Sequence, residues 1–213
     1  MAQPSEKPVR AARGAEALRT AKRTGPVLLL ALLAGCALTQ GPDEPNETYD
    51  LIAPERPGGG GSTNAQLLVK EPTALRALNS DRIVLKPSPY VITYVADAQW
   101  NDTAPKLIQA RLVEAFQNTA RTGATAKPGD GLVIDYQLVS DLRRFEIDGS
   151  TNEAVLEIAV KLLADRNGKV VETRIFEARV PATSADREGY VRALDDAFDA
   201  VATRMIAWVL GTV

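Results

Sequence analysis

Of the side chains that most often carry out chemistry, this 213-residue chain has no histidine and one cysteine, so we consider its carboxylates and its one thiol first. The lack of histidine excludes a Ser-His-Asp or Cys-His catalytic pair, histidine-ligated zinc and an imidazole general base. A single cysteine excludes an intrachain disulfide and a cysteine-rich metal site. Two carboxylates held close together could still act as a general acid and a general base. Carboxylate catalysis and modification of the thiol are therefore the chemistries to weigh.

The carboxylates follow the pattern of a solvated surface. Four of them occur in one stretch, at Asp135, Asp141, Glu146 and Asp148. The stretch alternates apolar and polar residues, as a strand with one solvated face does, so several of these carboxylates are expected on that face. Three more lie on the polar side of a predicted helix, at Asp195, Asp196 and Asp199. We therefore predict a protein that is not an enzyme and that uses no cofactor and no metal ion.

The cysteine lies at the end of a short apolar run, which spans residues 26–34. That run is too short for the roughly 18–20 residues of a membrane-spanning helix. A basic leader, an apolar run and small residues make up a cleavable secretion signal. A buried core helix is the alternative, but no amphipathic pattern surrounds the run. Leu33, Ala34, Gly35 and Cys36 resemble a bacterial lipobox, which implies cleavage after Gly35 and a lipid on the sulfur of Cys36.

The lipobox assigns residues 1–35 to a lipoprotein signal peptide and makes Cys36 the first residue of the mature chain. Acyl chains such as palmitate contribute about 0.8 kcal/mol per buried CH₂, so several chains hold a soluble domain on a membrane. Loss of residues 1–35 removes six basic and two acidic residues, which leaves 19 basic and 25 acidic residues and a net charge of −6. An acidic body argues against nonspecific binding of nucleic acid and against electrostatic docking to anionic lipid. The lipid is therefore the expected anchor.

Residues 36–64 are predicted to form a lipidated, flexible tether, because they are rich in proline, glycine and acidic residues. Such a composition buries too little apolar area to become ordered, and a chain of this length has an r.m.s. span of roughly 30 Å. The glycine run at 58–61 is not a phosphate-binding loop, because no Gly-Lys-Ser/Thr follows it. Residues 49–52 alternate apolar and polar positions and could dock as an edge strand, which would halve the free length.

Residues 65–213 are predicted to form an α+β domain with two groups of strands. Short strands are expected at 65–69, 82–86 and 90–95, with one or two helical turns at 73–78. Longer alternating strands are expected at 134–147, 156–162 and 170–180. A parity shift across Arg143-Arg144 indicates a bulge, and Asn167-Gly168 predicts a two-residue type I′ turn. The long strands should therefore form an antiparallel meander.

Two amphipathic helices are predicted to cover this sheet. The first is capped by Asp102 or Thr103 and ends at Gly123, and the second is capped by Ser184 and ends at Gly211. Their apolar stripes favour an antiparallel sheet with both helices packed on one face. The other face, or a sheet edge, is then available to a partner.

Several short motifs along the mature chain together resemble the pattern of a known protein family. They are the lipobox, Tyr49-x-Leu51, Leu67-x-Val69, Asp81-Arg82-Ile83, Tyr94 and Trp100. Together they resemble the auxiliary lipoproteins of ABC-type transport systems, in the paraquat-inducible group that works with mammalian-cell-entry-type proteins. The resemblance implies an envelope-side part of a machine that moves lipid or another apolar substrate between the two membranes. The glycine-rich stretch inserted between Tyr49 and Leu67 departs from the family pattern at the first strand.

The resemblance also implies partners and a location. The partners are a mammalian-cell-entry-type periplasmic protein and an ABC permease and ATPase. Ala37 follows the lipidated cysteine where aspartate would signal retention in the inner membrane, so we expect the outer membrane, with the domain facing the periplasm. Edge strands invite pairing, which makes a homo-oligomer an expected arrangement. Two alternatives stay open: an assembly or pilot lipoprotein of another envelope complex, and an enzyme that uses carboxylates alone.

Overall fold

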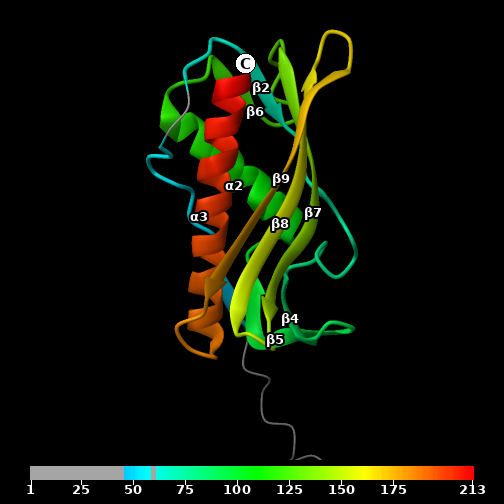
Figure 1. Cartoon of the computed structure of the whole chain (residues 1–213), viewed down its shortest axis with the longest axis vertical. Helices are drawn as coiled ribbons and strands as arrows, with labels where there is room; N and C mark the ends of the chain where they lie inside the picture. The colour runs from blue at the N-terminus through cyan, green and yellow to red at the C-terminus, as the bar shows by residue number, and fades with distance from the viewer. Residues whose placement is uncertain (1–45, 59–60) are drawn as a thin grey trace, which may run out of the picture. The chain divides into compact units, whose positions relative to one another are not determined.

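The computed structural model describes residues 46–58 and 61–213. Within these residues the chain forms a nine-stranded sheet and two helices, which confirms the α+β class (Figure 1). The strands are β1 (Glu47–Tyr49), β2 (Gln66–Val69), β3 (Thr73–Ala74), β4 (Arg82–Ser88), β5 (Val91–Trp100), β6 (Ala124–Ala126), β7 (Tyr136–Asp148), β8 (Glu153–Ala164) and β9 (Lys169–Pro181). The helices are α2 (Ala104–Thr119) and α3 (Arg187–Thr212).

The long strand β7 organises the sheet. It pairs antiparallel with β8 along one edge, and β8 pairs antiparallel with β9. The other edge of β7 is covered in succession by β2, β3 and β4, all of them parallel to it. β1 and β6 add parallel pairs with β5 and β2, while β4 and β5 form an antiparallel hairpin. The predicted meander of long strands is confirmed, but the sheet as a whole is mixed instead of antiparallel.

The bulge predicted at Arg143-Arg144 is confirmed, since the β7–β8 register shifts between Leu142 and Arg144. The type I′ turn predicted at Asn167-Gly168 is wrong. Ala164 pairs with Lys169, so residues 165–168 form the loop, and Gly168 closes it in a left-handed conformation with φ of 66°. A longer loop of this kind needs glycine at its end, where a side chain would be strained.

Residues 73–78 also differ from the prediction of helical turns. Thr73 and Ala74 form the strand β3, because they pair with Asp141 and Leu142 of β7. The single turn that follows is closed by the Leu78 N–H, which donates to the Leu75 carbonyl oxygen at 2.9 Å.

Helix α2 begins after Thr103, one of the two predicted caps, although the Thr103 hydroxyl makes no capping hydrogen bond. The helix ends at Thr119 and not at Gly123, because Ala120 turns into a left-handed conformation with φ of 51°. Gly123 has a different role. A Cβ atom there would lie 2.1 Å from the carbonyl oxygen of Asn64, so only glycine allows these two backbone segments to approach.

The cap of helix α3 is Asp186 and not the predicted Ser184. The Asp186 carboxylate accepts a hydrogen bond from the Gly189 N–H at 2.8 Å, and this bond lowers the pKa of Asp186 because it stabilises the charged form. The helix also continues past Gly211 to Thr212.

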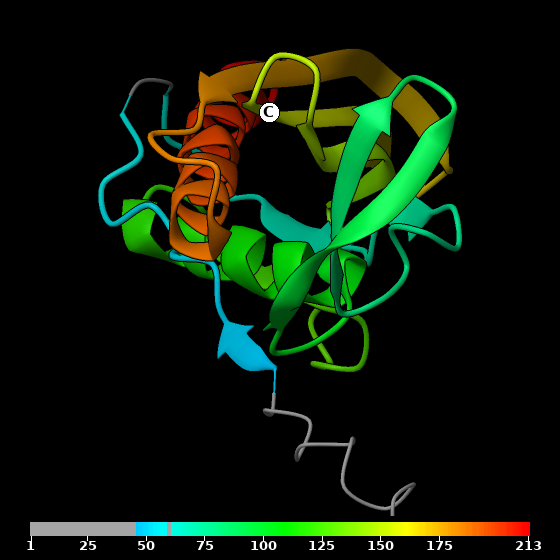
Figure 2. The ribbon, with the colours of Figure 1, turned by 90° about the horizontal axis from the view of Figure 1, so that it is seen from below.

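Both helices lie on the same side of the curved sheet, as predicted (Figure 2). Helix α3 packs against β8 and β9, and α2 packs against β2 and β6. Trp100 stacks on Phe145 with ring centroids 5.4 Å apart, so Trp100 is the core anchor that the sequence indicated. The inner side chains of β7 and β8 and the apolar stripes of both helices complete one continuous core.

Candidate functional site

The predicted lipid-attachment residue Cys36 and the lipobox residues Leu33, Ala34 and Gly35 lie outside the described residues. The structure does describe how the chain joins the domain downstream of them. β1 pairs in parallel with β5, with Thr48 opposite Gln99. The first strand therefore covers residues 47–49, slightly earlier than the 49–52 segment expected from the sequence.

The segment after β1 packs on the domain although its composition is that of a tether. Leu51 is only 2% exposed, whereas its neighbour Ile52 is 69% exposed. The Ile52 N–H donates to the Asp195 carboxylate at 2.8 Å. The Asn118 side-chain amide donates to the Pro54 carbonyl oxygen at 3.0 Å. We call residues 50–58 the strap, because they are held to both α2 and α3.

Asp195 differs from the solvated residue that the sequence predicted. Burial raises its pKa, and the nearby charges of Asp196, Asp199 and Asp50 act in the same direction, whereas the Ile52 N–H opposes them. The ion pair of Arg111 with Asp50 places a positive charge beside this acidic group. Asp195 thus accepts a hydrogen bond from the strap, while Asp196 and Asp199 are exposed as expected.

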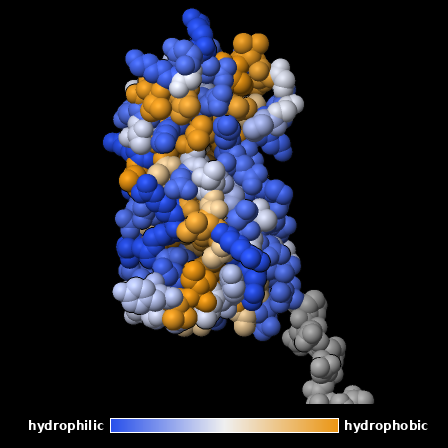
Figure 3. Space-filling view, turned by 90° about the vertical axis from the view of Figure 1, so that its right-hand side faces the viewer, coloured by the Kyte–Doolittle hydropathy of each residue, from blue (hydrophilic) through white to orange (hydrophobic). Residues whose placement is uncertain are grey.

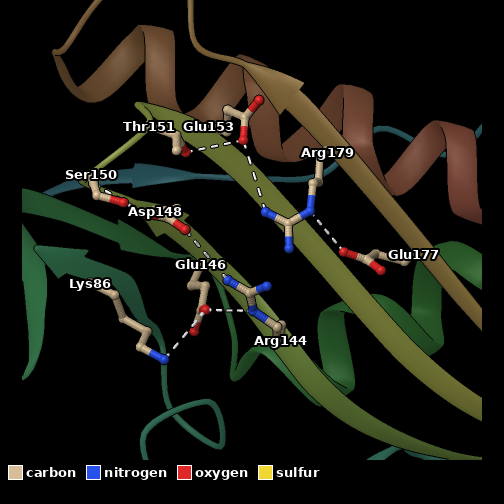
Figure 4. Close-up of polar contacts among 9 residues, drawn as sticks. All are labelled: Lys86, Arg144, Glu146, Asp148, Ser150, Thr151, Glu153, Glu177 and Arg179. Atoms are coloured by element: carbon tan, nitrogen blue, oxygen red, sulfur yellow. Dashed lines mark hydrogen bonds and ion pairs between the residues drawn. The ribbon is translucent and has the colours of Figure 1, made fainter. Parts of the chain in front are cut away.

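The outer face of the sheet carries paired charges, drawn in Figure 4. Glu146 is 5% exposed, which corrects the prediction of a solvated carboxylate. The Arg144 guanidinium donates to Glu146 at 2.7 Å, and the Lys86 ammonium lies 3.7 Å from the same carboxylate. Arg144 also reaches Asp148 at 3.8 Å, so β4 and β7 are joined by a continuous chain of ion pairs.

The same pattern continues toward β9. Arg179 donates to Glu177 at 2.9 Å and lies 3.9 Å from Glu153 of β8. On β7, hydrogen bonds from the Ser150 hydroxyl and N–H lower the pKa of Asp148. The Arg179–Glu153 pair joins β9 to β8, whereas Arg179–Glu177 lies within β9 and Ser150 follows Asp148 in the next turn.

The remaining carboxylates of the predicted cluster also hold backbone segments. Asp135 accepts the Gln66 N–H at 2.8 Å, and Asp141 accepts the Thr73 hydroxyl at 3.1 Å. In the described part of the chain, no group of three or more acidic or cysteine side chains is placed to hold a metal ion. The same residues contain no helix long and apolar enough to cross a membrane.

The β4–β5 hairpin exposes apolar side chains that sequence patterns did not single out. Tyr90 is 98% exposed, and Val91 and Ile92 are 47% and 50% exposed. The sequence identified Pro87-Ser88-Pro89 as a turn, but alternation alone cannot tell which strand ends project beyond the sheet. Figure 3 views the side toward which the hairpin projects in Figure 1 and shows apolar patches within a mainly hydrophilic surface.

A shallow groove lies between β9 and α3. It is lined by Arg174, Ile175, Phe176, Arg204, Ala207 and Trp208. The Trp208 ring meets Phe176 edge-on at 5.6 Å and is largely buried, so Trp208 belongs mainly to the core. Among the described strands, β9 pairs only with β8, and its other edge faces this groove.

Comparison with known proteins identifies the family. A family model described as ABC-type transport auxiliary lipoprotein component matches residues 49–206. The uncharacterized protein bll6063 of Bradyrhizobium diazoefficiens is 36% identical over 185 residues, which are 84% of this chain and 49% of that protein. The chain therefore spans about half the length of this curated relative.

Two solved structures share the fold. The crystal structure of protein XCC0632 from Xanthomonas campestris is 29% identical with a TM-score of 0.74, covering 78% of this chain and 95% of that one. The crystal structure of another uncharacterized protein, at 14% identity and a TM-score of 0.64, covers 78% and 99% of the two chains and shows the fold alone. The family match extends from the end of β1 into α3, and the chain belongs to the family of ABC-type transport auxiliary lipoprotein components.

Proposed function

We propose that this protein is a membrane-anchored periplasmic component of an ABC-type, mammalian-cell-entry-like transport system that moves lipid or another apolar substrate between the two membranes. Membership of the auxiliary lipoprotein family is the observation that carries the proposal. The lipobox-like sequence Leu33-Ala34-Gly35-Cys36 supports an acyl anchor on Cys36. With Ala37 next to that cysteine, the anchor is assigned to the outer membrane.

The domain works by contact and not by catalysis. Carboxylates on the outer face of the sheet form ion pairs between strands, as the contacts of Glu146 with Lys86 and of Glu153 with Arg179 illustrate. Carboxylates used in this way stabilise strand pairing and are unavailable as a free acid and base. This arrangement supports a role in binding partner proteins.

The chain between the proposed lipid anchor and the folded domain is short, so the domain cannot lie far from its membrane. Because Asn46 already lies beside β5, nine residues (37–45) separate it from Cys36 along the chain. An extended chain spans at most about 3.3–3.6 Å per residue, so Asn46 lies within about 35 Å of the lipidated sulfur. The domain is therefore held near its membrane, where a mammalian-cell-entry-type protein crossing the periplasm would meet it.

The free edge of β9 is the surface that we assign to protein partners. A strand edge offers backbone N–H and C=O groups to an added strand, either from the transport partner or from a second copy of this chain. On this edge the Glu177 carbonyl oxygen already accepts a hydrogen bond from the Arg204 guanidinium, which an added strand would displace. Ile175 on β9 is 53% exposed and would be covered by such a strand.

Isolation of the tagged protein from native membranes in mild detergent, followed by mass spectrometry, tests this function. We expect a mammalian-cell-entry-type protein, a permease and an ATPase to co-purify. Ile175→Asp should reduce their recovery, whereas Leu75→Asp, at an exposed position away from β9, should not. Recovery of only secretion-pore or lipopolysaccharide-pore subunits would instead support a pilot lipoprotein and contradict the proposal.

A further inference from the structure

The tip of the β4–β5 hairpin is an apolar projection without charge. We define the hairpin tip as residues 87–92, Pro-Ser-Pro-Tyr-Val-Ile. Tyr90 is almost fully exposed, and Val91 and Ile92 are about half exposed. Two prolines restrict the backbone, so an apolar contact made here costs little conformational entropy. A soluble domain gains nothing from presenting such a group to water.

The hairpin tip lies at the end of the domain where the anchored chain arrives. β1 pairs with the last residues of β5, Ala98–Trp100, whereas the tip adjoins the first residues of that strand. Figure 2, which looks at the domain from below, shows β1 and the hairpin both on the side toward the viewer. Asn46 precedes β1 and lies within about 35 Å of Cys36 along the chain. A membrane that carries the Cys36 lipid is thus within reach of this end.

We propose that the hairpin tip inserts into the interface of the same membrane that holds the Cys36 lipid, as a second contact that orients the domain. The proposal rests on the anchor in the proposed function. Tyrosine is favoured at the boundary between headgroups and acyl chains, because its ring is apolar and its hydroxyl stays wet. Val91 and Ile92 add apolar area on the same tip. The body of the mature chain is acidic, so apolar contact and not charge would drive this insertion.

Polar groups beside the hairpin tip suit the headgroup layer. A small cleft of about 180 Å³ is lined by Lys86, Ser88, Pro89, Arg144, Asp148 and Ser150. Lys86 and Arg144 are paired with carboxylates of β7, so the cleft brings almost no net charge to the membrane surface. Its ammonium, guanidinium and hydroxyl groups can donate to lipid phosphates while the tip lies deeper.

A site-specific probe in proteoliposomes tests the inference. The full-length lipoprotein with Tyr90→Cys is labelled with an environment-sensitive fluorophore and reconstituted into vesicles of phosphatidylethanolamine and phosphatidylglycerol. Val133→Cys is the matched control, because Val133 is 81% exposed and lines a groove with Val213, at the opposite end of the domain (Figure 1). We expect a shift of emission to shorter wavelength, and quenching by lipid-borne quenchers, for Y90C only.

Flotation of the same vesicles reports the anchor separately. A protein that floats while the Y90C probe emits like the V133C probe would overturn the insertion and leave the anchored function intact. A protein that fails to float would overturn both. Shielding of the Y90C probe that appears only after addition of the co-purified transport proteins would show a protein contact and would also overturn the insertion.

Discussion

Replacement of Leu51 by alanine tests whether the strap is a structural part of the domain. Leu51 is 2% exposed and packs in the core, and the strap to which it belongs is held by hydrogen bonds to α2 and α3. Leu→Ala changes at buried sites cost about 2–5 kcal/mol. The strap lies near the start of the folded part and can collapse toward the cavity, so we expect about 2–3 kcal/mol. At roughly 2–4 °C per kcal/mol for a domain of this size, the melting temperature falls by about 4–12 °C.

The adjacent residue is the matched control. Ile52 is 69% exposed, and alanine keeps the backbone N–H that donates to Asp195. Ile52→Ala should therefore change stability by no more than about 0.5 kcal/mol. Urea unfolding followed by tryptophan fluorescence and thermal melting by circular dichroism compare the two variants. Equal stability of L51A and I52A would mean that the strap is not packed against the domain.

Two further substitutions probe the packing around the strap and the helices. Gly123→Ala should destabilise the domain by about 1–3 kcal/mol in denaturant titration, because the new Cβ atom would lie 2.1 Å from the Asn64 carbonyl oxygen. Gly211→Ala is the control, because a Cβ atom at Gly211 would meet open space. Equal unfolding midpoints for the two variants would refute the close approach at Gly123. Asp195→Asn keeps an oxygen acceptor and removes a half-buried charge. Because folding raises the pKa of Asp195, the folded state holds its proton to higher pH, and stability is lost as pH rises through that pKa. Melting curves should therefore show a gain for D195N at neutral pH that vanishes at acidic pH, and a gain independent of pH would contradict this reasoning.

The parts of the fold that follow local patterns could be predicted from the sequence. Apolar and polar residues alternate along much of β7, β8 and β9, so the presence of these strands, their antiparallel order and the bulge at Arg143-Arg144 could be predicted from the sequence. The apolar stripes of α2 and α3 likewise set the side of the sheet on which they lie. These features depend on residues close together in the chain, where side-chain periodicity decides the structure.

Pairing between strands far apart in the chain leaves no such signal in the sequence. The parallel pairing of β2, β3 and β4 with β7 joins segments about 60 to 70 residues apart, and each pair is fixed by tertiary packing. The strap has the composition of a tether, yet Leu51 finds a buried site in the core. Glu146 lies on the outer face as alternation predicts, but Arg144 and Lys86 cover it.

The candidate surfaces were only partly visible in the sequence. The lipobox is a local motif, so Cys36 could be named directly. The hairpin tip was not recognised, because exposure at the end of a strand depends on how far the hairpin extends beyond its neighbours. The free edge of β9 was anticipated in general terms, since a meander must end in an edge strand.

The most direct test of the account is the intact mass of the protein purified from membranes, measured with and without globomycin. The account predicts a mature chain that begins at Cys36 and carries diacylglyceryl mass on its sulfur, and a precursor that retains residues 1–35 when the signal peptidase is inhibited. A chain that keeps residues 1–35 without any inhibitor and carries no lipid would contradict the anchored function.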